Sequence, residues 1–335
     1  MNESQLYIQV STGDDDQAEM LTNSYLRPYA SLCLAAHFHE GNAHSGEQLT
    51  ASIMPGQERF TTFPDTKCLL SFVVEIANQH GELIGSCEFQ RAAFIDHVRA
   101  IASRILAKQN GSDSRNETEV VAKDIQYCLH FTIDGSPLSP RVRIPPIRET
   151  DIDALGRGAK HLLLSSGNSS HAPAVMTTFI TQEVYDQLES LAERSELSGL
   201  EEGCLLDGEV LFDPRRRRFA RLITEFIPAV GADTGEASLR INGDCWSHYY
   251  KTHSGEGVLL AEGHSHPSIL TQHIPAGSVM FVSSSDRGIH RQFFWQFFQS
   301  TVILSKPENK GFQLGVWGWH NGFIVPEQEA YILGA

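Results

Sequence analysis

Hydrophobic and polar positions repeat with two different periods along this chain, which indicates a mixed α/β protein. Residues 6–10, 68–76 and 125–133 are alternating or nearly apolar runs of the kind that forms strands. The run at 68–76 has so few polar positions that we expect a central strand. Between 91 and 108, apolar residues recur every three or four positions, which predicts an amphipathic helix. Residues 1–165 are therefore expected to form a mixed α/β domain.

The second half of the chain repeats this mixture after a polar boundary. Residues 165–173 contain four serines together with a Gly, an Asn and a Pro, which indicates a connection between domains. Residues 175–180 predict a strand, and Thr181 is placed to cap the helix that follows. Two further strands are expected to pair through a turn at 213–218, which carries four consecutive arginines. We therefore expect a second α/β domain over residues 174–335.

Two histidines lie one residue apart at the end of an apolar run, at His264 and His266. Side chains alternate along a strand, so both imidazoles face the same side and can bind one ion. Pro267 tends to end the strand there, and Asp286 follows as a third, anionic ligand. Two His and one carboxylate leave the fourth tetrahedral position of Zn²⁺ open, as in catalytic sites. The alternative is a polar strand end with an unrelated Asp.

Other potential ligands lack such surroundings. The pair His37 and His39 has neither an apolar approach bounded by a proline nor a matching Asp, so we expect a surface or core pair. The six cysteines are scattered without a Cys-x-x-Cys motif. This spacing disfavours both a disulfide scaffold and a thiolate zinc site.

The sequence His264-Ser-His-Pro267, followed by Ser283-Ser-Ser-Asp286, resembles the JAB/MPN-type (JAMM) zinc metalloproteases. The pattern of that family is an upstream Glu, then His-Ser/Thr-His-Pro, then Ser-x-x-Asp. The resemblance covers residues 174–335 and implies a JAB/MPN-like, cytidine-deaminase-like domain with a mixed sheet flanked by helices. The gap of sixteen residues before Ser283 exceeds the family's usual one. It indicates an inserted loop at 268–280, for which we expect a lid or substrate-selecting role.

The resemblance also implies a role for each residue of the pattern. The implied zinc ligands are His264, His266 and Asp286. Ser283 is implied to help hold the tetrahedral oxyanion, and the upstream Glu to exchange protons with the attacking water and the leaving amine. Counting back seven positions from Gly208 reaches Glu201, although Cys204 stands where the family has a glycine. Adjacent strand residues face opposite sides, so we choose Glu201 over Glu202; the alternative is that both are surface acids.

Composition narrows the choice of partners. The chain has 335 residues, 41% of them hydrophobic and 20% charged, which is typical of a soluble globular protein. Its net charge of −15 disfavours binding to nucleic acid or anionic membranes. The arginines at 215–218 are then expected to be a solvated hairpin tip, with contact to an acidic partner as the alternative. No export signal or run of about 18 apolar residues is recognised, so we expect a cytoplasmic protein.

The resemblance implies a zinc-dependent isopeptidase or peptidase that cleaves after the C-terminus of a ubiquitin-like protein. Its setting would be a bacterial ubiquitin-like conjugation system, with antiphage defence as a further expectation. The expected partners are the ubiquitin-like protein, its conjugates and the conjugating enzymes, recognised in part by the N-terminal domain. Two alternatives share the fold, a non-catalytic scaffold and a DNA-repair-associated relative. A barrel amidohydrolase would need further His and Asp ligands after later strands, and we find no such set.

Overall fold

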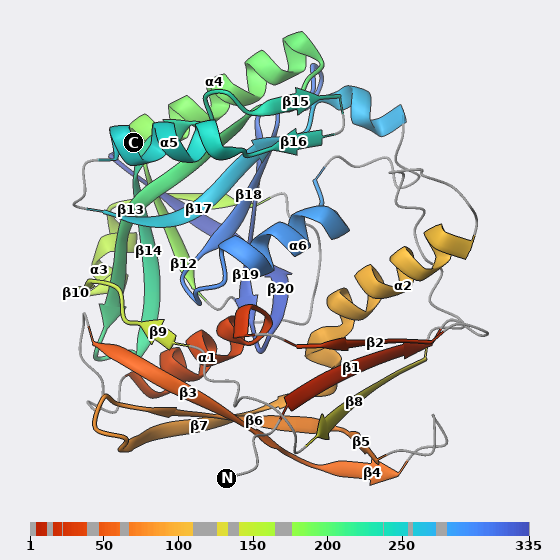
Figure 1. Cartoon of the computed structure of the whole chain (residues 1–335). Coiled ribbons are helices and arrows are strands. Elements are labelled where there is room, and N and C mark those ends of the chain that lie inside the picture. Colours follow the sequence, from red (N-terminus) through yellow and green to blue (C-terminus); the bar gives the residue numbers. More distant parts are fainter. Residues whose placement is uncertain are drawn as a thin grey trace. The chain divides into compact units, whose positions relative to one another are not determined.

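The computed structural model describes residues 5–11, 16–21, 23–38, 47–60, 67–109, 126–132, 141–164, 176–236, 238–253, 257–272 and 280–334. Its contacts divide the chain into two compact units (Figure 1). Unit 1 consists of Met1–Ile144, Arg287–Gln296 and Asn321–Phe323. Unit 2 consists of Pro145–Asp286, Phe297–His320 and Ile324–Ala335. The described residues contain no helix that is both long and apolar enough to cross a membrane.

Unit 1 combines small antiparallel sheets with two helices. One sheet has the strand order β2-β1-β8, with bounds Asp16–Met20, Gln5–Ser11 and Gln126–Thr132. A second has the order β7-β6-β3-β9, with bounds Leu83–Gln90, Ser71–Ala77, Gln48–Pro55 and Arg141–Arg143. A short pair joins β4 (Glu58–Phe60) to β5 (Lys67–Leu69). The helical elements are α1 (Asn23–His37), the 3₁₀ turn η2 (Arg91–Phe94) and α2 (Ile95–Gln109).

An aromatic core holds α1 against the four-stranded sheet. The Tyr29 ring on α1 lies 5.1 Å from the Phe72 ring, 5.1 Å from the Phe89 ring and 5.0 Å from the Phe94 ring. Large buried rings of this kind dominate the energetics of a small core. They come from β6, β7 and η2, so this cluster fixes how α1 lies on the sheet.

Most strands and the helix predicted for the first half are confirmed. The expected strands at 6–10 and 125–133 are β1 and β8, and the expected helix at 91–108 is η2 followed by α2. The run at 68–76 is not one strand, because the backbone bends at Leu70 between β5 and β6. Leu70 donates its N–H to the carbonyl of Gln57 and accepts from Arg91. These bonds to other segments interrupt the ladder, and β6 alone is the interior strand that the pattern predicted.

Unit 2 is built on a curled, ten-stranded mixed sheet. Its order is β11-β21-β12-β14-β13-β17-β18-β19-β20, and β10 also pairs with β13. The bounds are β10 Ile147–Glu149, β11 Lys160–Leu163, β12 Thr177–Thr181, β13 Gly203–Asp213, β14 Arg218–Pro228, β17 Val258–Ser265, β18 Ser300–Ser305, β19 Gln313–His320, β20 Phe323–Pro326 and β21 Glu329–Leu333. The sheet contains both parallel pairs, such as β12 with β14 and β17 with β18, and antiparallel ones, such as β13 with β17. The sheet is therefore mixed, and with its helices unit 2 belongs to the α/β class.

Helices and a small strand pair complete unit 2. The helical elements are α3 (Ile152–Arg157), α4 (Gln182–Ser198), α5 (Gly243–Thr252), η4 (Ser268–Gln272) and the start of α6 (Ser284–Phe293). The pair is β15 (Asp233–Gly235) with β16 (Ser238–Arg240). Helix α4 begins after Thr181 as predicted, but the Thr181 side chain makes no capping hydrogen bond. It ends at Gly199, whose φ of 70° is the left-handed conformation that glycine tolerates.

The predicted arginine turn joins β13 and β14 into an antiparallel hairpin. The Asp213 carboxylate accepts the backbone N–H groups of Arg215 and Arg216 at 2.9 and 3.1 Å, which fixes the turn. Arg216 and Arg218 also form ion pairs with Asp153 of α3. The turn is exposed, as expected, and two of its cations already have an anionic neighbour in their own unit.

The stretch expected to separate two domains, 165–173, lies outside the described residues. The pairing of the strands before it shows where those strands belong. Strand β10 pairs with β13 in parallel, and β11 pairs with β21 antiparallel. Both strands, which the sequence placed in a domain over 1–165, are thus part of the sheet of unit 2, which begins at Pro145. Their pairing partners are distant in sequence, so local pattern could not assign them.

Candidate metal centre

Strand β17 carries the paired histidines through the middle of the unit 2 sheet. It lies between β13 and β18 and is buried from Leu260 to Ser265 (Figure 1). His264 is in the strand, and His266 follows directly after its end. Their ring centroids are 5.0 Å apart, and both side chains are buried. The backbone N–H of His266 donates to Leu304 at 2.7 Å and Ser305 donates to its carbonyl at 2.9 Å, so the second histidine is held as firmly as the first.

The structure brings Asp286 to this pair from the first turn of α6. The Asp286 Oδ1 atom lies 3.7 Å from His264 Nε2. One ligand atom from each of His264, His266 and Asp286 lies within 4.8 Å of the other two. Two imidazole nitrogens and a carboxylate oxygen are donors that Zn²⁺ accepts, and three protein donors leave a tetrahedral position open.

Ser283 positions Asp286 through a reciprocal pair of hydrogen bonds. The Ser283 backbone N–H donates to Asp286 Oδ2 at 2.8 Å, and the Asp286 N–H donates to Ser283 Oγ at 3.1 Å. This is the arrangement of a capping box at the start of a helix. The sequence suggested Ser283 for an oxyanion; the structure gives it a further task, holding the carboxylate that faces the histidines.

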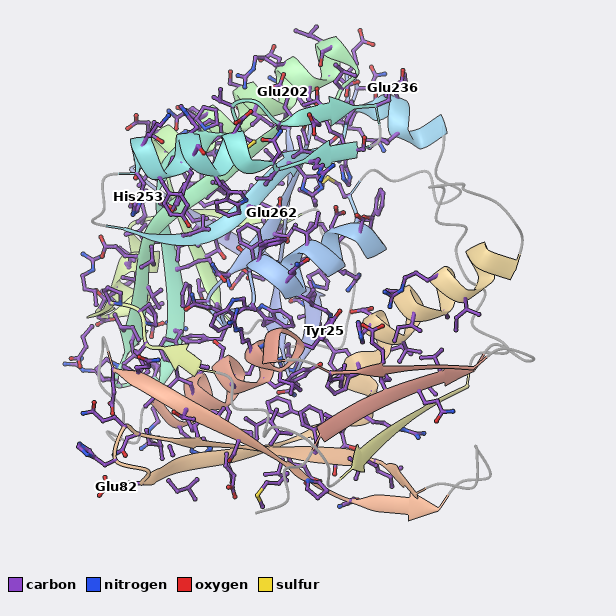
Figure 2. All side chains as sticks on the ribbon, viewed as in Figure 1. Tyr25, Glu82, Glu202, Glu236, His253 and Glu262 are labelled. Atoms are coloured by element: carbon purple, nitrogen blue, oxygen red, sulfur yellow. The ribbon has the colours of Figure 1, made fainter. Side chains whose placement is uncertain are left out.

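Glu262 is a residue of this site that the sequence interpretation missed. It lies on β17, where Figure 2 labels it, two positions before His264 and therefore on the same face of the strand, and its carboxylate is buried. Its Oε2 atom lies 3.1 Å from His264 Nδ1. A carboxylate on the far nitrogen fixes the tautomer of a metal-binding histidine and makes it a stronger ligand. The signal was present as an acidic residue inside an apolar strand, at the period of two that brings it beneath His264.

The charges of the cluster depend on one another. Burial lowers the pKa of His264, but the carboxylates of Glu262 and Asp286 outweigh burial and hold it well above its ordinary value. Burial raises the pKa of Asp286, but the neighbouring His264 outweighs it and holds that pKa far below its usual range. The Asp286 carboxylate therefore stays ionised beside the histidines. A buried anion of this kind is an environment that attracts a cation.

Glu201 lies at the edge of the cluster, just before β13. Strands β13 and β17 pair so that Gly203 is opposite His264. The pairing continues through Glu202, whose N–H donates to Ser265 Oγ at 2.8 Å and whose carbonyl accepts from the Ser265 N–H at 2.9 Å. Glu201 therefore falls opposite His266, with Oε1 4.0 Å from its Nε2 atom.

Glu201 and its neighbour Glu202 have different environments, as the alternation argument required. The pKa of Glu201 is raised to about 7: burial raises it most, His264 lowers it, and Asp286 and Glu262 raise it. The Glu202 carboxylate instead accepts from Arg194 Nη2 at 3.0 Å. Of the two acids, Glu201 is the one beside the histidines, and a carboxyl with a pKa near neutrality can both take and give a proton.

The segment after Pro267 is described only in its first part. Residues Ser268–Gln272 form η4, and the Ser268 N–H donates to the Glu196 carboxylate of α4 at 2.7 Å. Residues 273–279, the greater part of the expected inserted loop, lie outside the described residues. The lid or substrate-selecting role of this loop stays a prediction.

A second polar cluster in unit 2 was not expected from the sequence. Asp207 on β13 is fully buried and accepts from the Tyr249 hydroxyl at 3.1 Å; its other oxygen lies 2.5 Å from His253 Nδ1. Glu225 lies close enough to join a ligand group with these two residues. Tyr249 and His253 already satisfy both Asp207 oxygens, which is what keeps a buried carboxylate stable.

Comparisons with known proteins give this chain no family. No family model matches it, and no curated protein matches it. A solution structure of the protein DSY2949 from Desulfitobacterium hafniense is similar over 47% of this chain and 92% of that one, with 18% identity and a TM-score of 0.33. A likeness this distant carries no argument about fold or activity.

Proposed function

We propose that unit 2 is a zinc metallohydrolase of the JAB/MPN (JAMM) type that cleaves an amide bond. The observation that carries the proposal is the convergence of His264, His266 and Asp286 within 4.8 Å of one another, with Glu201 beside them. The residues come from three separate segments, which defined contacts hold: β13 pairs with β17, and the Ser283 N–H donates to the Asp286 carboxylate. The mixed sheet, with α4 against it, is compatible with a JAB/MPN-like domain.

The donor set fits zinc. Two neutral imidazoles and one carboxylate are a common ligand set for catalytic Zn²⁺, whereas Mg²⁺ and Ca²⁺ prefer oxygen donors alone. Glu262 supplies the carboxylate behind His264 that such sites use to orient a ligand. His264, His266 and Asp286 would hold the ion, and the fourth position would stay open.

Each residue around the ligands has a task in amide hydrolysis. Zn²⁺, when bound, lowers the pKa of water and polarises a carbonyl oxygen. Glu201 accepts the proton that the attacking water loses and returns it to the departing amine, for which its pKa of about 7 is suited. Ser283 keeps Asp286 in place, and its hydroxyl hydrogen is the group proposed to donate to the oxyanion.

The substrate follows from the resemblance of the motif rather than from the geometry. We propose a peptide or isopeptide bond at the C-terminus of a ubiquitin-like protein, in deconjugation or precursor processing. The cytoplasmic setting would be a bacterial ubiquitin-like conjugation system, with a role in antiphage defence. Unit 1 would recognise the substrate or the conjugating enzymes. The net charge of −15 favours a protein with a basic face over nucleic acid or a membrane surface.

The test is cleavage of a ubiquitin-like protein fused at its C-terminus to a reporter, with and without a chelator. We expect a single cut after the last residue of the ubiquitin-like protein, which mass spectrometry locates and the chelator prevents. Glu201→Gln should keep the zinc and lose turnover. Glu202→Gln is the matched control, because it changes the adjacent acid, and should cleave normally. Full zinc occupancy without cleavage of any fusion, and no difference between the two variants, would favour a scaffold instead.

A further inference from the structure

Helix α1 and strand β7 of unit 1 each carry a row of three residues on one face. Tyr29, Cys33 and His37 are spaced by four and therefore share one face of α1. Phe89, Cys87 and Gly85 alternate on one face of β7. The sheet-facing Tyr29 ring lies 5.1 Å from the Phe89 ring. One turn of α1 further along, Cys33 follows Tyr29, and His37 follows after another turn. On β7, Cys87 and Gly85 take the corresponding positions beyond Phe89.

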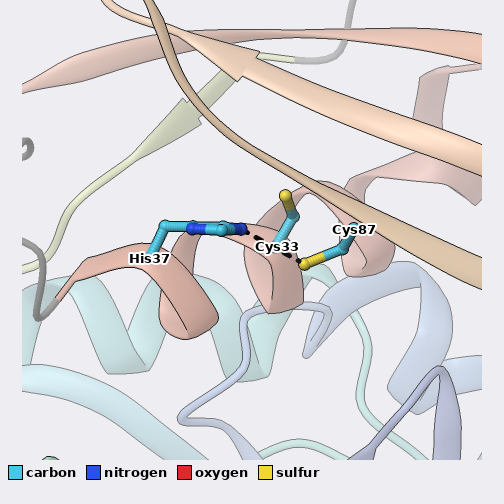
Figure 3. Close-up of side chains that lie close together, drawn as sticks. All are labelled: Cys33, His37 and Cys87. Atoms are coloured by element: carbon cyan, nitrogen blue, oxygen red, sulfur yellow. Dashed lines mark hydrogen bonds between the residues drawn. The ribbon is translucent and has the colours of Figure 1, made fainter.

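The polar end of these rows is a compact group of three metal-binding side chains. One ligand atom from each of Cys33, His37 and Cys87 lies within 4.8 Å of the other two. His37 Nε2 lies 3.7 Å from Cys87 Sγ (Figure 3). A tetrahedral zinc ion with ordinary Zn–S and Zn–N bond lengths places its sulfur and nitrogen ligands about 3.6 Å apart. This pair of atoms is therefore already at the spacing that one ion requires.

Gly85 leaves the space in which the His37 ring lies. A Cβ atom at this position would fall 2.3 Å from His37 Cγ and 2.4 Å from Cδ2. Any other residue at position 85 would have to displace the imidazole. The atoms in the way belong to the rigid His37 ring, which cannot bend aside as a flexible chain end could. The ring is thus seated against the β7 backbone, and its Nε2 edge is directed at Ser86 and Cys87.

We propose that Cys33, His37 and Cys87 bind a transition-metal ion of the class that prefers thiolate and imidazole, with Zn²⁺ as the probe. Two thiolates and one imidazole select soft or borderline ions over Mg²⁺ and Ca²⁺. Among the described residues the group has three members, so one tetrahedral position would be left to an external ligand. This site is separate from the proposed hydrolase site and does not depend on it.

Binding the ion exchanges hydrogen bonds for metal bonds. The Cys33 thiol now donates to the Val74 carbonyl at 3.4 Å, and His37 Nε2 lies 3.0 Å from the Ser86 carbonyl. On binding, both thiols lose their protons to solvent, and Nε2 binds the ion while Nδ1 carries the ring proton. The metal bonds replace one weak thiol hydrogen bond and the hydrogen bond of His37 to the Ser86 carbonyl.

A reactive cysteine is the main alternative use of this cluster. Such residues have a lowered thiol pKa and an exposed sulfur. Cys33 is fully buried and Cys87 is half-buried, so neither sulfur has the open access that such residues have. The metal site is therefore the better interpretation.

Cobalt substitution tests the proposal, because a cobalt ion bound to thiolate shows an intense near-ultraviolet charge-transfer band. The candidate hydrolase site has no cysteine ligand, so the band would report this cluster alone. The full chain, kept reduced with a phosphine that does not bind metal, should show the band, and zinc should displace it. Cys33→Ser and Cys87→Ser should abolish it. Cys245→Ser, which changes a buried cysteine of α5, and His264→Ala should leave it unchanged.

Further variants keep the test decisive if Cys33→Ser does not fold. His37→Ala, whose ring is only partly buried, should lose most of the cobalt affinity while its thermal unfolding stays cooperative. Gly85→Ala should do the same by displacing the ring. Absence of the band in the wild type, or a band that survives both cysteine variants, overturns the proposal. A Cys33–Cys87 disulfide under non-reducing conditions, with no band after reduction, overturns it as well.

Discussion

Single residues behind the proposed ligands determine which atom of each ligand faces the candidate zinc position. His264 offers Nε2 toward Asp286 because Nδ1 faces the Glu262 carboxylate at 3.1 Å. The motif predicted the three ligands from the sequence, since period-two spacing alone puts both imidazoles on one face. It does not include Glu262, whose spacing from His264 was a signal in the sequence but whose contact with Nδ1 only the structure shows.

Replacing Glu262 with Gln should weaken zinc binding without unfolding the protein. Gln keeps the size of the side chain but removes the negative charge behind His264, so the imidazole becomes a weaker ligand. We expect zinc affinity to fall about 10- to 100-fold, as for other residues behind metal ligands. Competition with a coloured chelator measures this change. Glu202→Gln serves as the control, and equal affinities for the two variants would remove Glu262 from the site.

At the scale of elements, the site depends on where one strand pairs and where one helix begins. The β13–β17 register brings Glu201 opposite His266, and the Ser283–Asp286 capping box starts α6 at the metal-facing carboxylate. The sequence predicted β1, α2 and the β13–β14 hairpin from periodicity and turn chemistry. It did not predict the bend at Leu70, because hydrogen bonds to Gln57 and Arg91 cause it.

Ser283→Ala separates two tasks proposed for this serine. Loss of the hydroxyl leaves the Asp286 N–H without its Ser283 acceptor and should cost about 1 kcal/mol at the start of α6. We therefore expect weaker zinc binding together with slower cleavage. Ser283→Asn, which can still cap the helix, should restore zinc affinity. If Ser283 served the oxyanion alone, Ser283→Ala would slow cleavage and leave zinc affinity unchanged.

Tyr29 should make unit 1 sensitive to alkaline pH. Burial raises its pKa to about 12, and its hydroxyl donates to the Ala93 carbonyl at 3.1 Å. Its neutral form is favoured in the folded state, so this stability is complete below the unfolded pKa near 10 and is lost as pH rises toward 12. The loss amounts to about 3 kcal/mol.

Urea unfolding at several pH values measures the effect. The free energy of unfolding of the wild type should fall faster between pH 10 and 12 than that of Tyr29→Phe, which has no hydroxyl to ionise. Parallel pH dependences of the two proteins would show that the Tyr29 pKa is not shifted.

At the scale of the whole molecule, the described residues form three groups of potential metal ligands. Cys33–His37–Cys87 lies in unit 1, and both His264–His266–Asp286 and Asp207–Glu225–His253 lie in unit 2. The His264–His266–Asp286 group was foreseeable because its motif lies mostly within one stretch. The Cys33–His37–Cys87 group was not: the spacing of the cysteines argued against a thiolate site, and α1 must pack on β7 before these side chains meet. The same limit applies to β10 and β11, whose place in the sheet depends on partners far along the chain.

The central claim is that His264, His266 and Asp286 hold one zinc ion. The most direct measurement is zinc content with X-ray absorption of the Cys33→Ser/Cys87→Ser protein, in which the cluster of unit 1 cannot contribute. We predict one zinc per chain, bound by nitrogen and oxygen alone, and its loss in the same protein carrying His266→Ala. A protein without zinc, or one that keeps its zinc after both His264→Ala and His266→Ala, would contradict the account.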